Sequence, residues 1–250
     1  MSQIHLSEVT KSYDGKDVVD RIDLAIESDT TTAVVGPSGS GKTTLLQLIN
    51  GLVRPDHGRV HVFGRSIDYD ALPQLRLKIG YAVQGTGLFP HMTVWKNITI
   101  LARLNNWQRQ RVDERGRHLM ELAGLPATMA ARYPHELSGG EQQRVGLCRA
   151  MMLDPTIFLL DEPFGALDSI TRDEIHREFL HIQRTEPRTI VLVTHDMREA
   201  LRLAERVVIV DQGRVVQDSA REEIIANPAN NFVRNLVHSQ LDTWRPEDSH

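Results

Sequence analysis

Hydrophobic and polar positions along the chain form short periodic segments. Residues 4–9 and 18–26 alternate apolar and polar side chains, and Asp14-Gly15-Lys16 lies between them. A period of two on both sides of a turn predicts two antiparallel strands joined as a hairpin. Three further short segments are expected to be strands, at 33–35, 59–63 and 79–83.

Beyond residue 138 the pattern changes repeatedly between the period of a helix and that of a strand. Helices are expected at 138–152 and 169–184, and strands at 157–160, 190–193 and 207–210. Strands that alternate with helices predict a parallel sheet with right-handed crossovers. The tail from residue 214 is expected to add a hairpin strand and two short helices.

The middle of the chain is expected to be a helical insertion. Residues 94–123 have helical periodicity, interrupted at the turn-prone pair Asn105-Asn106. We therefore predict one α/β domain over 1–250, whose mostly parallel sheet is joined by an antiparallel subdomain at the amino terminus. Its catalytic core comprises 1–88 and 135–250, and its helical subdomain 89–134.

Composition and charge restrict the class of protein. The chain is 40% hydrophobic and 25% charged, which is ordinary globular usage. Its 29 Lys and Arg against 33 Asp and Glu give a formal charge of -4, which disfavours a nucleic-acid partner. The one cysteine, Cys148, excludes an intramolecular disulfide and is expected to be a small packed residue in a cytoplasmic protein.

No membrane segment is expected. The amino terminus has no basic region followed by an apolar run, and no apolar run approaches the roughly 20 residues that span a bilayer. A membrane role therefore requires a separate partner.

A glycine-rich phosphate loop follows the strand at 33–35. The loop matches G-x-x-x-x-G-K-[ST] before a helix expected at 43–49, and its residues are Gly36, Pro37, Ser38, Gly39, Ser40, Gly41, Lys42 and Thr43. Glycines let the backbone N–H groups turn inward, and the helix amino terminus adds positive charge. Lys42 is expected to reach the terminal phosphates and Thr43 to bind Mg²⁺, with Thr44 completing the nucleotide-binding segment.

Two rival motifs fail. Ser38 and Ser40 do not complete the G-x-S-x-G of a serine hydrolase. The pair Gly85 and Gly87 lacks the third glycine of a dinucleotide loop, because position 90 is Pro90.

Two adjacent carboxylates end the strand expected at 157–160. Asp161 is suited to Mg²⁺, usually through water. Glu162 points differently and is expected to orient or deprotonate the attacking water. A solvated acidic strand end is the alternative interpretation, and the phosphate loop weakens it.

A third motif identifies a family. Leu137-Ser138-Gly139-Gly140-Glu141-Gln142-Gln143-Arg144, at 137–144, resembles the signature sequence of the ATP-binding-cassette (ABC) family and precedes the acidic strand as it does there. Ser138 with the Gly139 and Gly140 backbone at a helix start forms a second anion site. The resemblance implies that this site contacts ATP held by a second subunit.

Other family elements occur in order, so that the resemblance covers nearly the whole chain. The resemblance implies that Tyr13 stacks on adenine, that Gln84 senses Mg²⁺ and the partner, that Asp168 crosses the dimer, and that His195 contacts the terminal phosphate. Taken alone, Tyr13 and His195 would be interpreted as a packed strand aromatic and a satisfied strand-end histidine. Gly85 departs from the polar or acidic residue that many members carry after the glutamine, which predicts a looser joint.

The remaining histidines give no metal pair. His176 and His181 are five positions apart and are expected to be solvated.

The resemblance implies a fold and a function. An ABC ATPase binds ATP and Mg²⁺, hydrolyses ATP as a pair of subunits and lies at the cytoplasmic face of the membrane beneath separate permease subunits. Residues 79–94 resemble the importers of quaternary-amine osmoprotectants such as glycine betaine, choline or carnitine, which act with a substrate-binding protein. Residues 89–94 are expected to transmit nucleotide state to the membrane partner.

Two alternatives stay open. The first is an importer of another small solute, such as a polyamine, an amino acid or a sugar. The second is an ABC ATPase that acts as a cytosolic switch, although the chain carries neither a second signature nor sustained heptads.

Overall fold

The computed structural model describes residues 2–83, 85, 87–165 and 169–241 of the 250. Gln84 and Asp168, which the sequence singles out, lie outside the described residues. The chain forms two compact units. The first comprises residues 1–75 and 189–250, and the second comprises 76–188.

An antiparallel sheet opens the first unit. Its strands run in the order β2-β1-β4-β5 and are β1 (Ser2–Tyr13), β2 (Lys16–Glu27), β4 (His57–Val62) and β5 (Arg65–Ser66). Along β2, Ile22, Leu24 and Ile26 are buried and the residues between them are exposed, as one-sided packing of a pleated strand requires. The predicted hairpin is confirmed, with Asp14 and Gly15 in the left-handed region that its tight turn needs.

The second sheet of this unit contains the predicted parallel strands. Strand β3 pairs in parallel with β8 and β9, and β10 pairs antiparallel with β9; their bounds are β3 (Thr31–Val35), β8 (Thr189–Thr194), β9 (Arg206–Asp211) and β10 (Arg214–Ala220). Strands β3 and β8 are buried throughout, as expected of central parallel strands.

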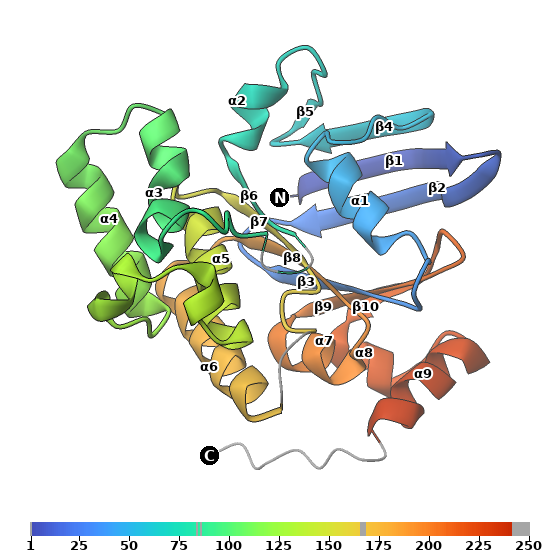
Figure 1. The fold of residues 1–250 in the computed structure, drawn as a ribbon. Coiled ribbons are helices and arrows are strands. Elements are labelled where there is room, and N and C mark those ends of the chain that lie inside the picture. The colour runs from blue at the N-terminus through green and yellow to red at the C-terminus, as the bar shows by residue number, and fades with distance from the viewer. Residues whose placement is uncertain (1, 84, 86, 166–168, 242–250) are drawn as a thin grey trace. The chain divides into compact units, whose positions relative to one another are not determined.

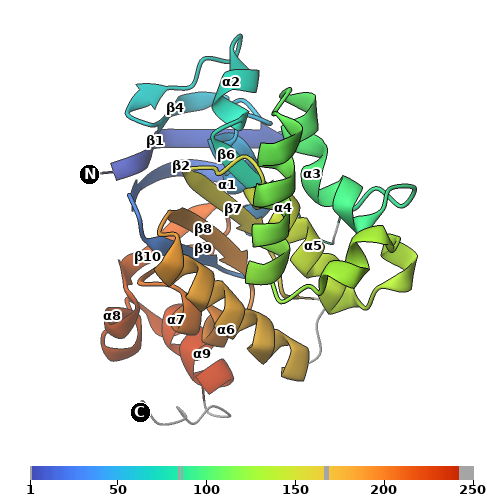
Figure 2. The same ribbon diagram turned by 90° about the vertical axis from the view of Figure 1, so that its left-hand side faces the viewer.

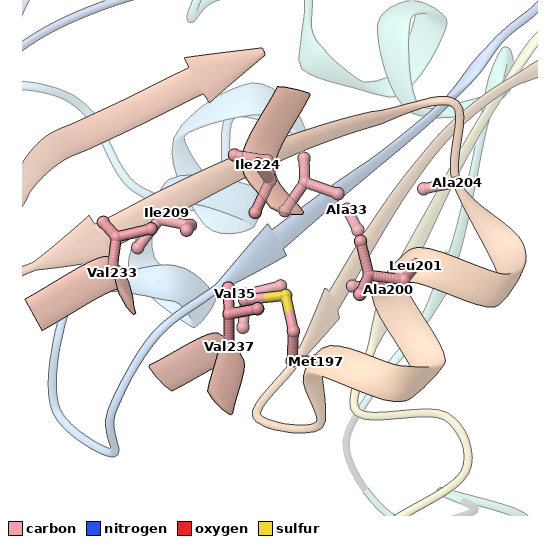
Figure 3. Close-up of a cluster of buried hydrophobic side chains, with 11 residues drawn as sticks. Ala33, Val35, Met197, Ala200, Leu201, Ala204, Ile209, Ile224, Val233 and Val237 are labelled. Carbon is pink, nitrogen blue, oxygen red and sulfur yellow. The ribbon is translucent and has the colours of Figure 1, made fainter. Parts of the chain in front are cut away.

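Among the described residues, the helices that lie wholly within this unit are α1 (Lys42–Ile49), α7 (Met197–Leu203), α8 (Arg221–Ala226) and α9 (Asn231–Leu241) (Figure 1). One face of the sheet packs on the last three. Val35 and Ile209 from the strands meet Met197, Ile224 and Val237 from these helices in one apolar cluster (Figure 3). Burying a side chain of this size contributes roughly 1.5–3 kcal/mol, so the carboxyl-terminal helices are part of the core that holds β3 in place.

The second unit pairs two parallel strands with helices. Strand β6 (Ile79–Ala82) lies beside β7 (Ile157–Asp161), with Tyr81 opposite Leu159. The helices are α3 (Val94–Leu104), α4 (Arg109–Leu122), α5 (Gly139–Met151) and α6 (Ser169–Thr185), with 3₁₀ turns η1 (Ala127–Ala131) and η2 (Pro134–Glu136). Helices α3, α4 and α5 pack against one another (Figure 2). The short α2 (Leu72–Arg76) crosses the boundary between the units.

The predicted break in the helical insertion is confirmed. Helix α3 begins after Thr93, whose hydroxyl accepts a hydrogen bond from the Lys96 amide, and ends at Leu104. Asn106 then takes a left-handed conformation, which asparagine tolerates better than most residues.

The expectation that His176 is exposed to solvent is wrong. His176 is not solvated: only 3% of it is exposed, and its ring packs edge-on against Phe164 at 4.7 Å between centroids. It lies on the same side of α6 as the buried Ile175 and Phe179, which the five-residue spacing from exposed His181 did not reveal.

Cys148 is packed as expected. Its Sγ lies 3.3 Å from the Leu119 carbonyl oxygen, which accepts its hydrogen bond, and burial raises the pKa of its thiol to about 12.

No helix in the described part of the chain is long and apolar enough to cross a membrane.

Candidate functional site: a phosphate loop, an acidic strand end and a capped helix

The phosphate loop connects β3 to α1 within the first unit. A side chain at Gly36 would place Cβ 2.0 Å from the Val210 carbonyl oxygen, and one at Gly41 would place it 2.3 Å from the Val18 carbonyl oxygen. Gly41 also has a φ of 99°, directly before α1. These two glycines are therefore required by the close approach of β9 and β2, and the loop has little freedom to take another shape.

Backbone hydrogen bonds complete the support of the loop. The Ser40 amide donates to the Pro37 carbonyl at 3.3 Å, and the Gly213 amide donates to the Ser40 carbonyl at 3.2 Å. The hydroxyl of Ser40 is buried and has no hydrogen-bond partner among the described residues. Helix α1 has no acidic residue in its first turn, so its amino terminus and this hydroxyl suit an anion.

The Lys42 side chain turns back onto the loop that precedes it. It is only 6% exposed, and its Nζ donates hydrogen bonds to the carbonyl oxygens of Gly36 at 2.8 Å and Pro37 at 2.7 Å. The loop thus holds the ammonium that is expected to contact the phosphates bound there. Pro37, Ser38, Gly39 and Thr43 are exposed, and Thr44 is half-buried.

His195 and Tyr13 belong to the same unit as the loop. Val35 pairs with Thr194 across β3 and β8, so Gly36 and His195 leave neighbouring parallel strands at the same edge of the sheet, where ligands commonly bind. His195 is exposed. Tyr13, at the end of β1, is 44% exposed, and the Lys11 ammonium lies 5.4 Å from its ring centroid. The Tyr13 ring is therefore not a packed strand aromatic.

The acidic strand end lies in the second unit. Asp161 is 2% exposed at the end of β7. Tyr81 on the adjacent β6 hydrogen-bonds its carboxylate, and burial, the Asp161 charge and this bond raise the pKa of Tyr81 to about 12. The phenol therefore stays protonated as a donor. A buried, oriented carboxylate fits a site for a hard divalent cation.

Glu162 has a strained backbone. Its φ is 46°, in the left-handed region that glutamate rarely adopts, and its carbonyl accepts a hydrogen bond from the Gly165 amide at 3.3 Å. Such strain costs roughly 1–3 kcal/mol and is concentrated at functional sites. The abrupt turn gives Glu162 a direction that continued strand geometry would not provide.

The signature segment forms the start of α5. The Ser138 hydroxyl accepts from the Glu141 amide at 3.3 Å, and the Ser138 amide donates to the Glu141 carboxylate at 2.7 Å. This capping box lowers the pKa of Glu141, chiefly through the Ser138 amide. Ser138 and Gly139 are exposed and Gly140 is buried, so a hydroxyl and a helix amino terminus are presented at the surface.

Sequence reasoning missed three residues that support these segments. Tyr81 contacts Asp161, Asn97 contacts the loop at 89–93, and Arg149 contacts Gly87. The sequence signals for them are weak. Tyr81 falls on the strand predicted at 79–83, whose pairing with the acidic strand is known only from the structure, and Arg149 falls on the signature helix.

The chain is similar to known proteins over most of its length. A family model described as "ABC transporter" matches residues 19–165. The glycine betaine/carnitine/choline transport ATP-binding protein OpuCA of Bacillus subtilis (strain 168) is 47% identical over 98% of this chain and 65% of its own length. The chain therefore spans less than two thirds of the length of that relative.

Two solved structures share the fold. CbiO1 from Clostridium perfringens, described as part of the ABC transporter complex cbiONQ, is 26% identical, with a TM-score of 0.84 over 96% of each chain. A dimeric ATP-binding cassette in a post-hydrolysis state, bound to ADP and Pi, is 30% identical, with a TM-score of 0.80 over 87% of this chain and 98% of that one. The predicted ABC ATPase fold is confirmed.

Proposed function

Because the chain belongs to the ABC transporter family, we propose that it is the ATP-binding and ATP-hydrolysing subunit of an importer, working as a pair beneath separate membrane-spanning subunits. The observation that carries the proposal is the braced loop at 36–41 with Lys42 held over it. The dimeric, ADP-bound cassette of the same fold supports nucleotide use by two copies.

The first unit supplies the groups that hold ATP. The amides of Gly39 and Gly41 and the Lys42 ammonium are assigned to the phosphate oxygens. Lys42 would then exchange the loop carbonyls to which it now donates for these oxygens. The exposed Tyr13 ring stacks on adenine. His195 contacts the terminal phosphate from the strand beside the loop.

A second set of residues is assigned to hydrolysis. Mg²⁺, when bound, neutralises charge on the terminal phosphates. Thr43 and Asp161 are the residues assigned to it. Glu162 orients the attacking water and accepts its proton. Gln84, outside the described residues, is assigned to Mg²⁺ and to coupling.

Ser138, Gly139 and Gly140 are assigned to the nucleotide held by the second copy. An exposed capped helix start supports this assignment, because it offers an anion site at the surface. Asp168, outside the described residues, is assigned to the same contact between copies.

Glu162→Gln tests hydrolysis and pairing together. The amide keeps the size of the side chain but cannot accept the proton, so phosphate release should fall to background while ATP still binds. Size-exclusion chromatography with Mg-ATP should then show an accumulated dimer. Glu8→Gln is the matched control, because Glu8 is an exposed glutamate that also has positive φ. Wild-type turnover in Glu162→Gln would exclude Glu162 as the base, and a purely monomeric species would contradict the pair.

The proposed cargo is a quaternary-amine osmoprotectant such as glycine betaine, choline or carnitine. Its support is the 47% identity to OpuCA, a glycine betaine/carnitine/choline transport ATP-binding protein. The full system would include a substrate-binding protein, and this chain would be peripheral at the cytoplasmic face of the membrane. Cells lacking the chain should lose uptake of labelled glycine betaine, choline or carnitine and keep uptake of labelled spermidine. The reverse result would favour another solute, and unchanged uptake of all four would favour the cytosolic switch.

A further inference from the structure

The loop at 87–93 is held between two helices of the second unit. It begins beside α5, reaches the amino terminus of α3 and displays Phe89, which is 41% exposed. Asn97 on α3 and Arg149 on α5 hold the loop through different kinds of contact. We therefore assign a different role to each residue.

Asn97 on α3 determines the shape of the loop. It is fully buried, and its Oδ1 accepts from the Phe89 amide at 2.8 Å. Its Nδ2 lies 3.0–3.1 Å from the carbonyl oxygens of Phe89, Met92 and Thr93. One amide side chain thus replaces the backbone partners that a loop without regular structure lacks.

Arg149 on α5 holds the loop from the other side. Its Nη1 donates to the Gly87 carbonyl at 2.8 Å, and its guanidinium carbon lies 5.8 Å from the centroid of the Phe89 ring. Gly87 has a φ of 52°, and a Cβ there would lie 3.4 Å from Nη2 of Arg149 and 3.0 Å from Val83. The contact therefore depends on a glycine conformation as well as on the arginine.

Arg149 and Ser138 lie at opposite ends of one helix. Helix α5 begins directly after Ser138 and carries Arg149 in its last turn, about 16 Å further along the axis. A side chain at Gly80 of β6 would lie 2.6 Å from the Ala150 carbonyl oxygen, so the far end of α5 approaches β6 closely. Helix α5 is continuous from the Ser138 cap to Arg149, so we expect a displacement at its beginning to reach Arg149.

We infer that Arg149 is a positioning residue that transmits movement of the signature helix to the loop at 87–93 and thereby to Phe89. This inference rests on the proposed function, since it takes the nucleotide of a second copy as the ligand that moves Ser138. Arg149 is assigned no contact with ATP or with a metal. Its role is to make the loop follow α5, whereas Asn97 maintains the shape of the loop.

Hydrogen exchange measured by mass spectrometry tests the link. In the full chain carrying Glu162→Gln, Mg-ATP should slow exchange in segment 137–142, because Ser138 becomes covered, and should change exchange in segment 87–93. Adding Arg149→Met should abolish the ATP-dependent change at 87–93 and leave that at 137–142. Arg149→Lys should restore part of it, because lysine can still donate to the Gly87 carbonyl.

Two further variants control for folding. Arg117→Met removes an exposed arginine from α4 and should leave both segments unchanged. Gly87→Ala crowds Val83 and the Arg149 guanidinium from the loop side and is expected to weaken the same contact without altering α5. It covers the case in which Arg149→Met fails to fold. No protection at 137–142 in the parent would contradict the two-copy site itself. Protection there, together with a parent-like response at 87–93 in a folded Arg149→Met or Gly87→Ala variant, would overturn the inference alone.

Discussion

The phenol of Tyr81 and the carboxylate of Asp161 are hydrogen-bonded across two parallel strands. The bond fixes the direction of a buried carboxylate that we assign to Mg²⁺. Tyr81→Phe removes the donor and keeps the ring. The Mg²⁺ concentration for half-maximal phosphate release should therefore rise about two- to tenfold, the equivalent of about 0.5–1.5 kcal/mol, while turnover at saturating Mg²⁺ changes little.

Tyr69→Phe is the control for Tyr81. Its hydroxyl is buried with no hydrogen-bond partner in the described part of the chain, so removing it takes away no hydrogen bond. An unchanged Mg²⁺ requirement in Tyr81→Phe, or an equal rise in both variants, would show that the bond does not position Asp161.

Lys42→Ala should weaken ATP binding and preserve the fold. Each charge-assisted hydrogen bond from the ammonium to a phosphate oxygen is worth roughly 1.5–3 kcal/mol, so the variant should bind ATP about ten- to a hundredfold more weakly. Titration with a fluorescent ATP analogue measures this, and thermal unfolding checks the fold. Lys96→Ala, at an exposed site on α3, should match wild type. Full affinity in Lys42→Ala would remove this residue from the phosphate site.

Ser138→Arg should leave ATP binding to a single copy unchanged and abolish phosphate release. The long arginine side chain would block the close approach of the nucleotide held by the second copy to the beginning of α5. Ser138→Ala is the matched comparison, because it loses the same cap, worth about 1 kcal/mol, without adding bulk. If Ser138→Arg loses ATP binding at low protein concentration, Ser138 belongs to the pocket of its own chain.

Glu186 should make the stability of the second unit sensitive to acid. Burial alone would raise its pKa, but hydrogen bonds from Arg115 and His118, with the charges of Arg115 and Arg188, lower the pKa of Glu186 to about 2. The folded state therefore binds fewer protons than the unfolded state between about pH 5 and pH 2. The stabilisation is complete above that window and is lost as pH falls through it.

Urea unfolding at several pH values measures this effect. The loss of unfolding free energy caused by Glu186→Gln should be largest near pH 7 and should shrink as pH approaches 2. Glu121→Gln, at an exposed position on α4, should show no such trend. A constant difference across the pH range would mean that the charge of Glu186 is not what stabilises the unit.

Local features were predictable from sequence because local physics determines them. The loop at 36–41 requires glycine where other backbones approach, and the break after Leu104 follows from two turn-forming asparagines. The strands and helices follow from periods of two and 3.6.

Features that join distant segments were not predictable. Arg149 and Gly87 are 62 positions apart, and nothing near Arg149 marks its partner. His176 was misjudged because the sequence of α6 does not reveal which of its faces meets Phe164. The left-handed turn at Glu162 likewise depends on its surroundings, since glutamate has no intrinsic preference for it.

The burial of Cys148 gives the chain a practical property. Only a thiolate reacts readily with maleimides, and a pKa of about 12 keeps this thiol protonated at neutral pH behind a packed surface. The sequence has no other cysteine. A cysteine introduced at an exposed position would therefore be the single reactive handle, and a fluorophore attached there would report distances between two copies without a background mutation.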